Sequence, residues 1–266
     1  MAMDAIGEYR ALRKDGRLAD AAALLRRDLH LLQPNVVAQA GKMLLKDLAA
    51  LPAETKPLDV LVLGQCTTTY LPPLITAWAW AEGLRITVRE GGYDQVIQDL
   101  GALDEKHAPD VILLLPWNQR LLADDARGAA ERIEDEMTLL QQAWTHIARL
   151  KSKLVQVTYD WSSTGALGFS LSARRGGTIE LVRQANASMH AALPRGAFLV
   201  DLESLSAWHG KSHFYDERNY HWMKQPFSTG GLSLLARKIA AGLRALVCGR
   251  RKVLVLDLDN TMWGGV

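Results

Sequence analysis

The feature that most constrains this chain is an alternation, from residue 58 onward, of short apolar runs with longer stretches of helical periodicity. The apolar runs are 58–63, 84–88, 111–115, 153–157 and 197–200. Apolar residues at three- and four-residue spacing predict helices between and after these runs, at 72–82, 93–100, 129–149, 178–193 and 231–246. Strands that alternate with helices are joined by right-handed crossovers, which produce a parallel sheet covered on both faces. The chain is therefore predicted to contain a three-layer α/β/α domain.

The first fifty residues have a different pattern, in which alanine, leucine and arginine dominate and apolar residues recur at helical spacing. Lys14, Asp15 and Gly16 predict a tight turn between two helices, and Pro34 predicts the end of the second. We therefore predict a helical hairpin extension over residues 1–52, an α/β domain over 53–248, and the start of another domain over 249–266.

Composition excludes several classes of protein. The chain has 266 residues, 48% of them hydrophobic, and a formal net charge of +2 with both signs mixed along the sequence. A nucleic-acid protein is usually far more basic, and no apolar run reaches the length of a membrane span. Two cysteines do not make a disulfide framework, and the first residues do not resemble a signal peptide. The sequence predicts a cytoplasmic protein without a membrane or nucleic-acid partner.

Small and polar residues follow the predicted strands, where ligands bind in open parallel sheets. Gly64, Gln65, Cys66 and Thr67 follow the first run, and Gly92 follows the second. Asn118 follows the third run. The order along the chain is a nucleophile-type residue, Cys66, then a glycine, Gly92, and then an asparagine, Asn118. This order suggests an acyl-transfer site.

Cys66 is the candidate nucleophile, because a thiolate attacks acyl groups well even when only a small fraction is ionised. A helix that begins near Thr68 or Tyr70 would direct its N-terminal amides at Cys66 and favour the thiolate. The alternative is that Cys66 is a small apolar residue at a buried turn, which is common for free cysteine.

The segment from Trp208 to Phe227 contains many aromatic and polar residues and is predicted to be a long loop. A long loop inside a compact domain is often functional. His221 is the candidate general base in this segment, with Asp216 and Lys224 beside it. We do not predict a zinc site there, because no second ligand stands at a typical spacing.

This order of blocks resembles the SGNH hydrolase and GDSL esterase family. The resemblance implies that Cys66 attacks an acyl group and that His221 accepts the proton. It also implies an oxyanion and substrate-binding set, namely Gly64, Gln65, Thr67, Gly92, Asn118, Asp216 and Lys224. Two departures are that Cys66 replaces the family's serine and that Asp216 lies five residues before His221 instead of three.

The most specific stretch is at the end of the printed sequence, where the apolar run 253–256 leads into Asp257-Leu258-Asp259-Asn260-Thr261. Carboxylates two residues apart after a strand can reach one phosphoryl group, one as nucleophile and the other as acid and base. Asp257 and Asp259 are also the predicted ligands of a magnesium ion, which would offset the charge of the phosphate.

This stretch resembles the first motif of haloacid-dehalogenase-type (HAD) phosphatases. With Trp263-Gly264-Gly265-Val266 it resembles the FkbH-like proteins in particular, as does the Lys224–Ser228 stretch. The resemblance implies an SGNH-like domain followed by a HAD domain, of which the 266 residues hold only the first motif, so we expect a fragment. It implies a Mg²⁺-dependent enzyme that removes phosphate from 1,3-bisphosphoglycerate, a phosphorylated three-carbon acyl donor. The enzyme would load the glyceryl group through Cys66 onto an acyl carrier protein in polyketide-type biosynthesis.

Two other functions are compatible with the same residues. One is an SGNH-like hydrolase in which Cys66 releases acyl groups to water. The other is a docking module without catalytic activity, in which basic residues such as Arg174, Arg175 and Lys252 meet an acidic carrier protein. The sequence alone leaves these alternatives open.

Overall fold

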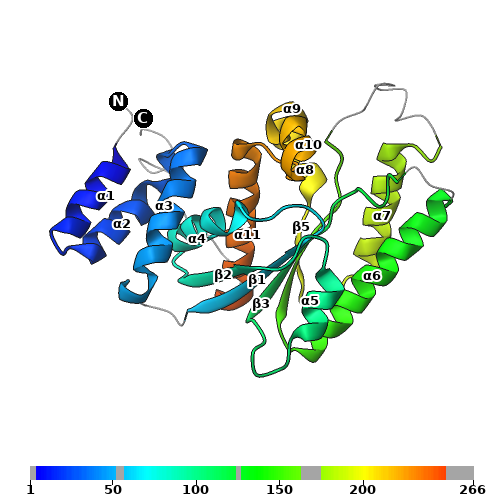
Figure 1. The fold of residues 1–266 in the computed structure, drawn as a ribbon, viewed down its shortest axis with the longest axis horizontal. Helices are drawn as coiled ribbons and strands as arrows, with labels where there is room; N and C mark the ends of the chain where they lie inside the picture. Colours follow the sequence, from blue (N-terminus) through cyan, green and yellow to red (C-terminus); the bar gives the residue numbers. More distant parts are fainter. Residues whose placement is uncertain (1–3, 52–56, 124–126, 163–174, 250–266) are drawn as a thin grey trace, which may run out of the picture.

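A computed structural model describes residues 4–51, 57–123, 127–162 and 175–249. Its centre is a five-stranded parallel sheet in the order β2-β1-β3-β4-β5, which Figure 1 shows between two layers of helices. The strands are β1 (Leu58–Gly64), β2 (Ile86–Glu90), β3 (Val111–Leu115), β4 (Lys153–Val157) and β5 (Phe198–Val200). The predicted three-layer α/β/α architecture with a parallel sheet is confirmed.

The central strands β1, β3 and β4 bury alternate side chains in two separate cores, because successive residues of a strand point to opposite faces. In β1, Val60 and Val62 face the layer formed by α4 (Leu71–Ala81) and α11 (Thr229–Cys248). Leu61 and Leu63 face the layer formed by the remaining crossover helices, α5 (Val96–Ala102), α6 (Ala129–Arg149) and α7 (Thr178–Ala192). Burial on both faces explains why the central strands are continuous apolar runs.

The N-terminal extension contains one helix more than the predicted hairpin. It consists of α1 (Ala5–Lys14), α2 (Leu18–Asp28) and α3 (Pro34–Asp47), with short 3₁₀ turns at Leu29–Leu31 and Leu48–Ala50. Pro34, predicted to end the second helix, also begins α3, because proline fits the first position of a helix. The buried side chains of α1, α2 and α3 join the same core as α4 and α11.

The contact between α3 and α4 is very close. A Cβ atom added to Gly41 of α3 would lie 1.8 Å from the carbonyl oxygen of Pro73 in α4. Only glycine allows the two backbones to approach this closely. The extension is thus packed directly on the α/β unit, at the opposite end of the molecule from α6 and α7 in Figure 1.

The prediction of a long loop from Trp208 to Phe227 is wrong, because the chain between β5 and the last helix folds into short helices. These are α8 (Leu202–His209), α9 (Lys211–Phe214) and α10 (Glu217–Met223). Aspartates cap two of them: Asp201 accepts from the Ser204 amide of α8 at 2.9 Å, and Asp216 from the Arg218 amide of α10 at 3.0 Å. Side-chain caps satisfy amides at a helix start that otherwise have no partner.

Within the described residues, no helix combines the length and the apolar character that crossing a bilayer requires. The predicted strand 253–256 and the two carboxylates that follow it lie outside the described residues.

Candidate active site

The candidate site lies where the sheet order reverses, between the carboxyl ends of β1 and β3. Strands in this order leave a crevice at that point, because the chains leaving β1 and β3 turn to opposite faces. Gly64 ends β1, and a Cβ atom there would lie 2.6 Å from Cγ2 of Thr68. The glycine therefore allows the loop that carries Cys66 to turn back tightly at the end of the strand.

Cys66 lies in this loop and is 1% exposed, within the core that α4 and α11 share. Burial raises the pKa of its thiol to about 12, because a thiolate loses its hydration there. The described protein therefore holds Cys66 as a neutral thiol at physiological pH.

The expectation that a helix N-terminus favours the thiolate is wrong for this structure. Helix α4 begins at Leu71, and its next two residues, Pro72 and Pro73, have no amide hydrogen. The Leu71 amide donates to the carbonyl of Thr68 at 2.8 Å. The first turn of α4 therefore offers Cys66 no free amide from these three positions.

Gln65 points away from the thiol, into the interior on the other face of the sheet. Its side-chain amide donates to Glu136 of α6 at 2.9 Å, and its oxygen accepts from the Trp117 amide at 2.8 Å. Glu136 also accepts from the hydroxyl of Tyr159 at 2.6 Å. Gln65 thus fixes the ends of β1 and β3 to α6. Its place in the substrate-binding set stays a prediction.

The two predicted oxyanion donors already have acceptors. The Gly92 amide donates to the Asp99 carboxylate at 2.7 Å. The side-chain amide of Asn118, a buried residue, donates to the carbonyl of Asp160 at 2.5 Å. Asn118 keeps a second amide hydrogen, whereas Gly92 would have to exchange its bond before it could stabilise an oxyanion. Their role in an oxyanion hole stays a prediction.

The loop that carries Cys66 is bound to the C-terminal end of α10. The Thr67 amide donates to the carbonyl of Lys224 at 2.9 Å, and its hydroxyl donates to the carbonyl of Met223 at 2.5 Å. Lys224 ends α10 in the left-handed region, at φ 56°. These bonds bring the end of the predicted His221 segment beside the loop of Cys66, although Thr67 and Met223 are 156 residues apart in sequence.

His221 lies on α10, but its side chain is exposed and makes no hydrogen bond with a described residue. Its ring lies 6.4 Å from that of Tyr220, between centroids. Asp216, its proposed neighbour, is engaged as the cap of α10. The structure therefore does not place a base against Cys66, and the role of His221 stays a prediction.

Cys66 lies in the same core as Trp117, Tyr215 and Phe227, with Tyr220 packed against that core, and the sequence pattern did not reveal this arrangement. We call these four aromatic side chains the aromatic cover. The ring of Trp117 lies 5.8 Å from that of Tyr215, 5.9 Å from that of Tyr220 and 5.9 Å from that of Phe227. Tyr93 and Tyr220 both donate to the side-chain oxygen of Gln119 at 3.2 Å. We call Tyr93, Gln119 and Tyr220 the tyrosine bridge, because they link the loop after β2 to α10 through the loop after β3.

A second unexpected feature is the carboxylate of Asp160, which follows β4 and is 0% exposed. It accepts from Ser206 and Tyr215, both at 2.5 Å, and from the ammonium of Lys211. No local sequence pattern links Asp160 to these partners, which come from α8, α9 and the residue after α9. The only sign in the sequence that Asp160 could matter was its place as a polar residue after a predicted strand.

The side-chain oxygen of Gln225 is buried and has no hydrogen-bond partner among the described residues. Gln225 follows Lys224, whose carbonyl binds the loop of Cys66. A buried acceptor without a donor destabilises the fold by about 1–3 kcal/mol, so a donor from a bound molecule would be favoured there.

The residues predicted to bind magnesium, Asp257 and Asp259, lie outside the described residues. Among residues 4–249 that are described, no three or more His, Cys, Asp or Glu side chains are grouped so that they could hold a metal ion. The described residues therefore do not form the magnesium site by themselves.

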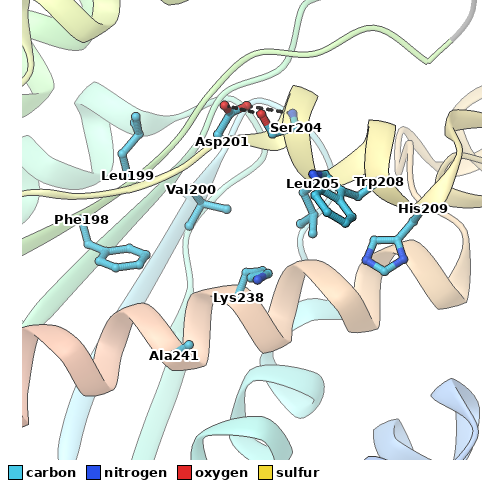
Figure 2. Close-up of a pocket in the computed structure, with 10 residues that line it drawn as sticks. All are labelled: Phe198, Leu199, Val200, Asp201, Ser204, Leu205, Trp208, His209, Lys238 and Ala241. Carbon is cyan, nitrogen blue, oxygen red and sulfur yellow. Dashed lines mark hydrogen bonds between the residues drawn. The ribbon is translucent and has the colours of Figure 1, made fainter. Parts of the chain in front are cut away.

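A cavity of about 570 Å³ lies beside the edge strand β5, between α8 and α11. Figure 2 shows Asp201 and Ser204 at one end and Trp208, His209 and Lys238 around it. Trp208 is 88% exposed. No predicted site residue lines this cavity, and it is not at the switch point of the sheet, so we assign the candidate active site to the Cys66 crevice.

Comparisons with known proteins agree with this fold. The chain matches the N-terminal part of the protein BF1531 from Bacteroides fragilis, a part that contains a phosphatase domain and was complexed with Mg. The TM-score is 0.71 at 20% identity, over 88% of this chain and 62% of that one. At this identity the likeness shows a shared fold.

Weaker overlaps are found with hydrolases. A putative GDSL-like lipase from Parabacteroides merdae has 16% identity and a TM-score of 0.44, over 72% of this chain and all of that one. An acetyl-xylooligosaccharide esterase from Geobacillus Stearmophilus has 14% identity and a TM-score of 0.45, over 75% of this chain and 97% of that one. No family model and no curated protein matches the sequence.

Proposed function

We propose that this chain is part of an FkbH-like enzyme that uses Cys66 to carry an acyl group from a phosphorylated three-carbon donor to a carrier-protein thiol. The observation that supports the proposal is the position of Cys66 at the switch point of a parallel sheet, in the same core as Trp117, Tyr215 and Phe227. Ligands of open parallel sheets bind at this place.

The reaction would proceed in two acyl transfers. The sulfur of Cys66 attacks the acyl carbon of 1,3-bisphosphoglycerate, the carbon–sulfur bond forms, and the bond to the acyl phosphate breaks. The thiol proton leaves to a base, for which His221 is the candidate. The thiol of an acyl carrier protein then attacks the thioester, and Cys66 leaves with the proton of the incoming thiol.

The remaining phosphate would be removed by a HAD domain. Asp257 would accept the phosphoryl group while Asp259 gives a proton to the leaving hydroxyl, and water activated by Asp259 would then release phosphate from Asp257. Both carboxylates would help to hold Mg²⁺, which would offset the charge of the phosphate. The likeness to a chain that contains a phosphatase domain supports this part of the proposal.

One feature of the described site favours acyl transfer over hydrolysis, and a second favours an acyl group that carries a hydroxyl. The aromatic cover and the burial of Cys66 exclude water from the thiol, which protects a thioester from hydrolysis. The unpartnered acceptor of Gln225 would accept a hydrogen bond from a hydroxyl of the acyl group.

The test is intact-mass spectrometry of the full-length protein with 1,3-bisphosphoglycerate, Mg²⁺ and an acyl carrier protein. A glyceryl adduct that maps to Cys66, and is lost in Cys66→Ala, is expected. Cys248→Ala is the matched control, because Cys248 is the exposed cysteine of the described chain and should be dispensable. A catalytically active protein without any adduct on Cys66 would refute the proposal, and rapid release of free acid would favour the hydrolase.

A further inference from the structure

The cavity beside β5 has the build of a small-molecule site, and the proposed acyl transfer does not use it. Its volume of about 570 Å³ lies in the range of about 300–1,000 Å³ that such sites usually have. Much of its lining is apolar, namely Phe198 and Val200 of β5, Leu205 of α8 and Ala241 of α11. An apolar lining with a few polar groups that fix orientation is typical of a ligand site.

The polar groups of the cavity favour an anion. Lys238 of α11 and His209 of α8 lie around it in Figure 2, and neither makes a hydrogen bond or an ion pair with another described residue. Among the described residues that line the cavity, Asp201 is the one acidic side chain, and its two oxygens accept from the amide and the hydroxyl of Ser204 at 2.9 and 2.6 Å. This carboxylate thus has donors of its own, whereas the ammonium of Lys238 has no acceptor among the described residues.

The open edge of the sheet adds a backbone donor. The Val200 carbonyl accepts from the Thr158 amide at 3.0 Å, so the backbone of Val200 faces the side of β4, with which β5 pairs in parallel. Successive residues of a strand direct their backbone groups to opposite edges, and the amide and carbonyl of Leu199 therefore face away from β4. Leu199 lines the cavity, so its amide is a further donor at the border of the cavity.

The side chain of Trp208 is the third feature of this surface. It is 88% exposed, although it lines the cavity next to Leu205 of the same helix. A large indole ring contributes strongly to binding when a ligand removes it from water. A ligand in the cavity would therefore cover a ring that the described fold leaves in water.

We propose that this cavity binds a monocarboxylate with a medium-length alkyl chain, a ligand that the acyl-transfer reaction does not require. The alkyl chain would lie against Phe198 and Leu205, in contact with the Trp208 ring, and the carboxylate would accept from Nζ of Lys238. An apolar molecule without a charge would leave Lys238 unpaired, and a small polar anion would leave the apolar lining in water. Each methylene that the cavity buries should strengthen binding by about three- to fourfold.

The experiment is isothermal titration calorimetry of the full-length protein with hexanoate, octanoate and octan-1-ol. Octanoate should bind about tenfold more tightly than hexanoate, because it has two more methylenes, and about fivefold more tightly than octan-1-ol, which has no charge. Lys238→Met should lower the affinity for octanoate to about that for the alcohol, and Lys238→Arg should retain it. Lys42→Met, at an exposed lysine of α3, is the matched control and should bind octanoate as the unaltered protein does.

Two further variants test whether the ligand lies in the cavity. Ala241→Trp should abolish octanoate binding, because a large side chain at this exposed position of α11 would fill the cavity without disturbing the core. Octanoate should shift the tryptophan emission of the unaltered protein but not that of Trp208→Phe.

Three results would overturn the inference: no octanoate binding at millimolar concentration, equal affinity for octanoate and octan-1-ol, or octanoate binding that neither Lys238→Met nor Ala241→Trp weakens. Lys238→Met and Trp208→Phe change exposed side chains, so the test remains available if Ala241→Trp does not fold. None of these results depends on an acyl adduct at Cys66, so the inference and the proposed function can fail separately.

Discussion

The tyrosine bridge should control access to Cys66, and Gln119→Ala tests this directly. The substitution removes the oxygen that accepts from both Tyr93 and Tyr220 at 3.2 Å. A hydrogen bond of this kind contributes about 0.5–1 kcal/mol net, since the freed hydroxyls can bind water instead. Loss of two bonds therefore favours open states by about 1–2 kcal/mol, which is a factor of roughly 5–30 in their population.

The assay is the alkylation rate of Cys66 relative to Cys248, measured by peptide mass spectrometry. A buried thiol reacts through open states, so its rate should rise in Gln119→Ala by about the same factor of 5–30. Tyr93→Phe removes one of the two bonds and should give a smaller increase. Gln98→Ala, which changes an exposed glutamine of α5, is the matched control.

Two results would refute this reasoning. An unchanged rate at Cys66 would mean that the bridge does not hold the cover closed. An equal loss of global stability in urea unfolding would mean that the whole fold has loosened and not the bridge alone.

Two further predictions concern stability. Burial raises the pKa of Cys66 to about 12. The stability that comes from burying the neutral thiol is therefore fully present below its unfolded pKa of about 9 and is lost as pH rises toward 12. As pH rises through this range, the free energy of unfolding of Cys66→Ala should therefore fall by about 1.4 kcal/mol per pH unit less than that of the unaltered protein, as measured by urea unfolding. Gly41→Ala should destabilise the fold by more than about 2 kcal/mol, because its Cβ would lie 1.8 Å from the Pro73 carbonyl. Gly101→Ala, where a Cβ meets nothing within 4 Å, should be neutral or stabilising, and an equal thermal shift in both variants would contradict this.

The strands could be predicted from the sequence because their burial leaves a local trace. The runs at 111–115 and 153–157 match β3 and β4 residue for residue, since both faces of these strands are covered. The edge strand β2 was predicted two residues too early, at 84–88 instead of 86–90. Its side chains are largely exposed, so no continuous apolar run marks where it begins and ends.

The helices α8, α9 and α10 could not be predicted in the same way. They have 8, 4 and 7 residues, too few for a helical period to stand out among many aromatic side chains. Their stability comes from contacts distant in sequence, such as those of Ser206 and Lys211 with Asp160. The capping aspartates Asp201 and Asp216 were the available local signals.

For the site, the sequence could predict which residues gather but not their chemical state. The order of strands brings Cys66 and Asn118 to one edge of the sheet, and this follows from topology alone. The raised pKa of Cys66, the use of Gln65 as an interior bridge and the acceptor of the Gly92 amide depend on neighbours far away in the chain. Such contacts have no periodic signal in the sequence.

The burial of Cys66 has two opposed consequences for an acyl carrier. A dry site protects a thioester from water, which suits transfer, but the same dryness keeps the free thiol neutral and slow to attack. Both requirements are met if the cover opens when the donor binds and closes over the acyl-enzyme. The tyrosine bridge and the bonds between Thr67 and the end of α10 are weak enough to break at that moment. Binding of a phosphorylated donor would supply the energy that opens the cover. Opening of the cover and activation of the thiol should therefore occur together.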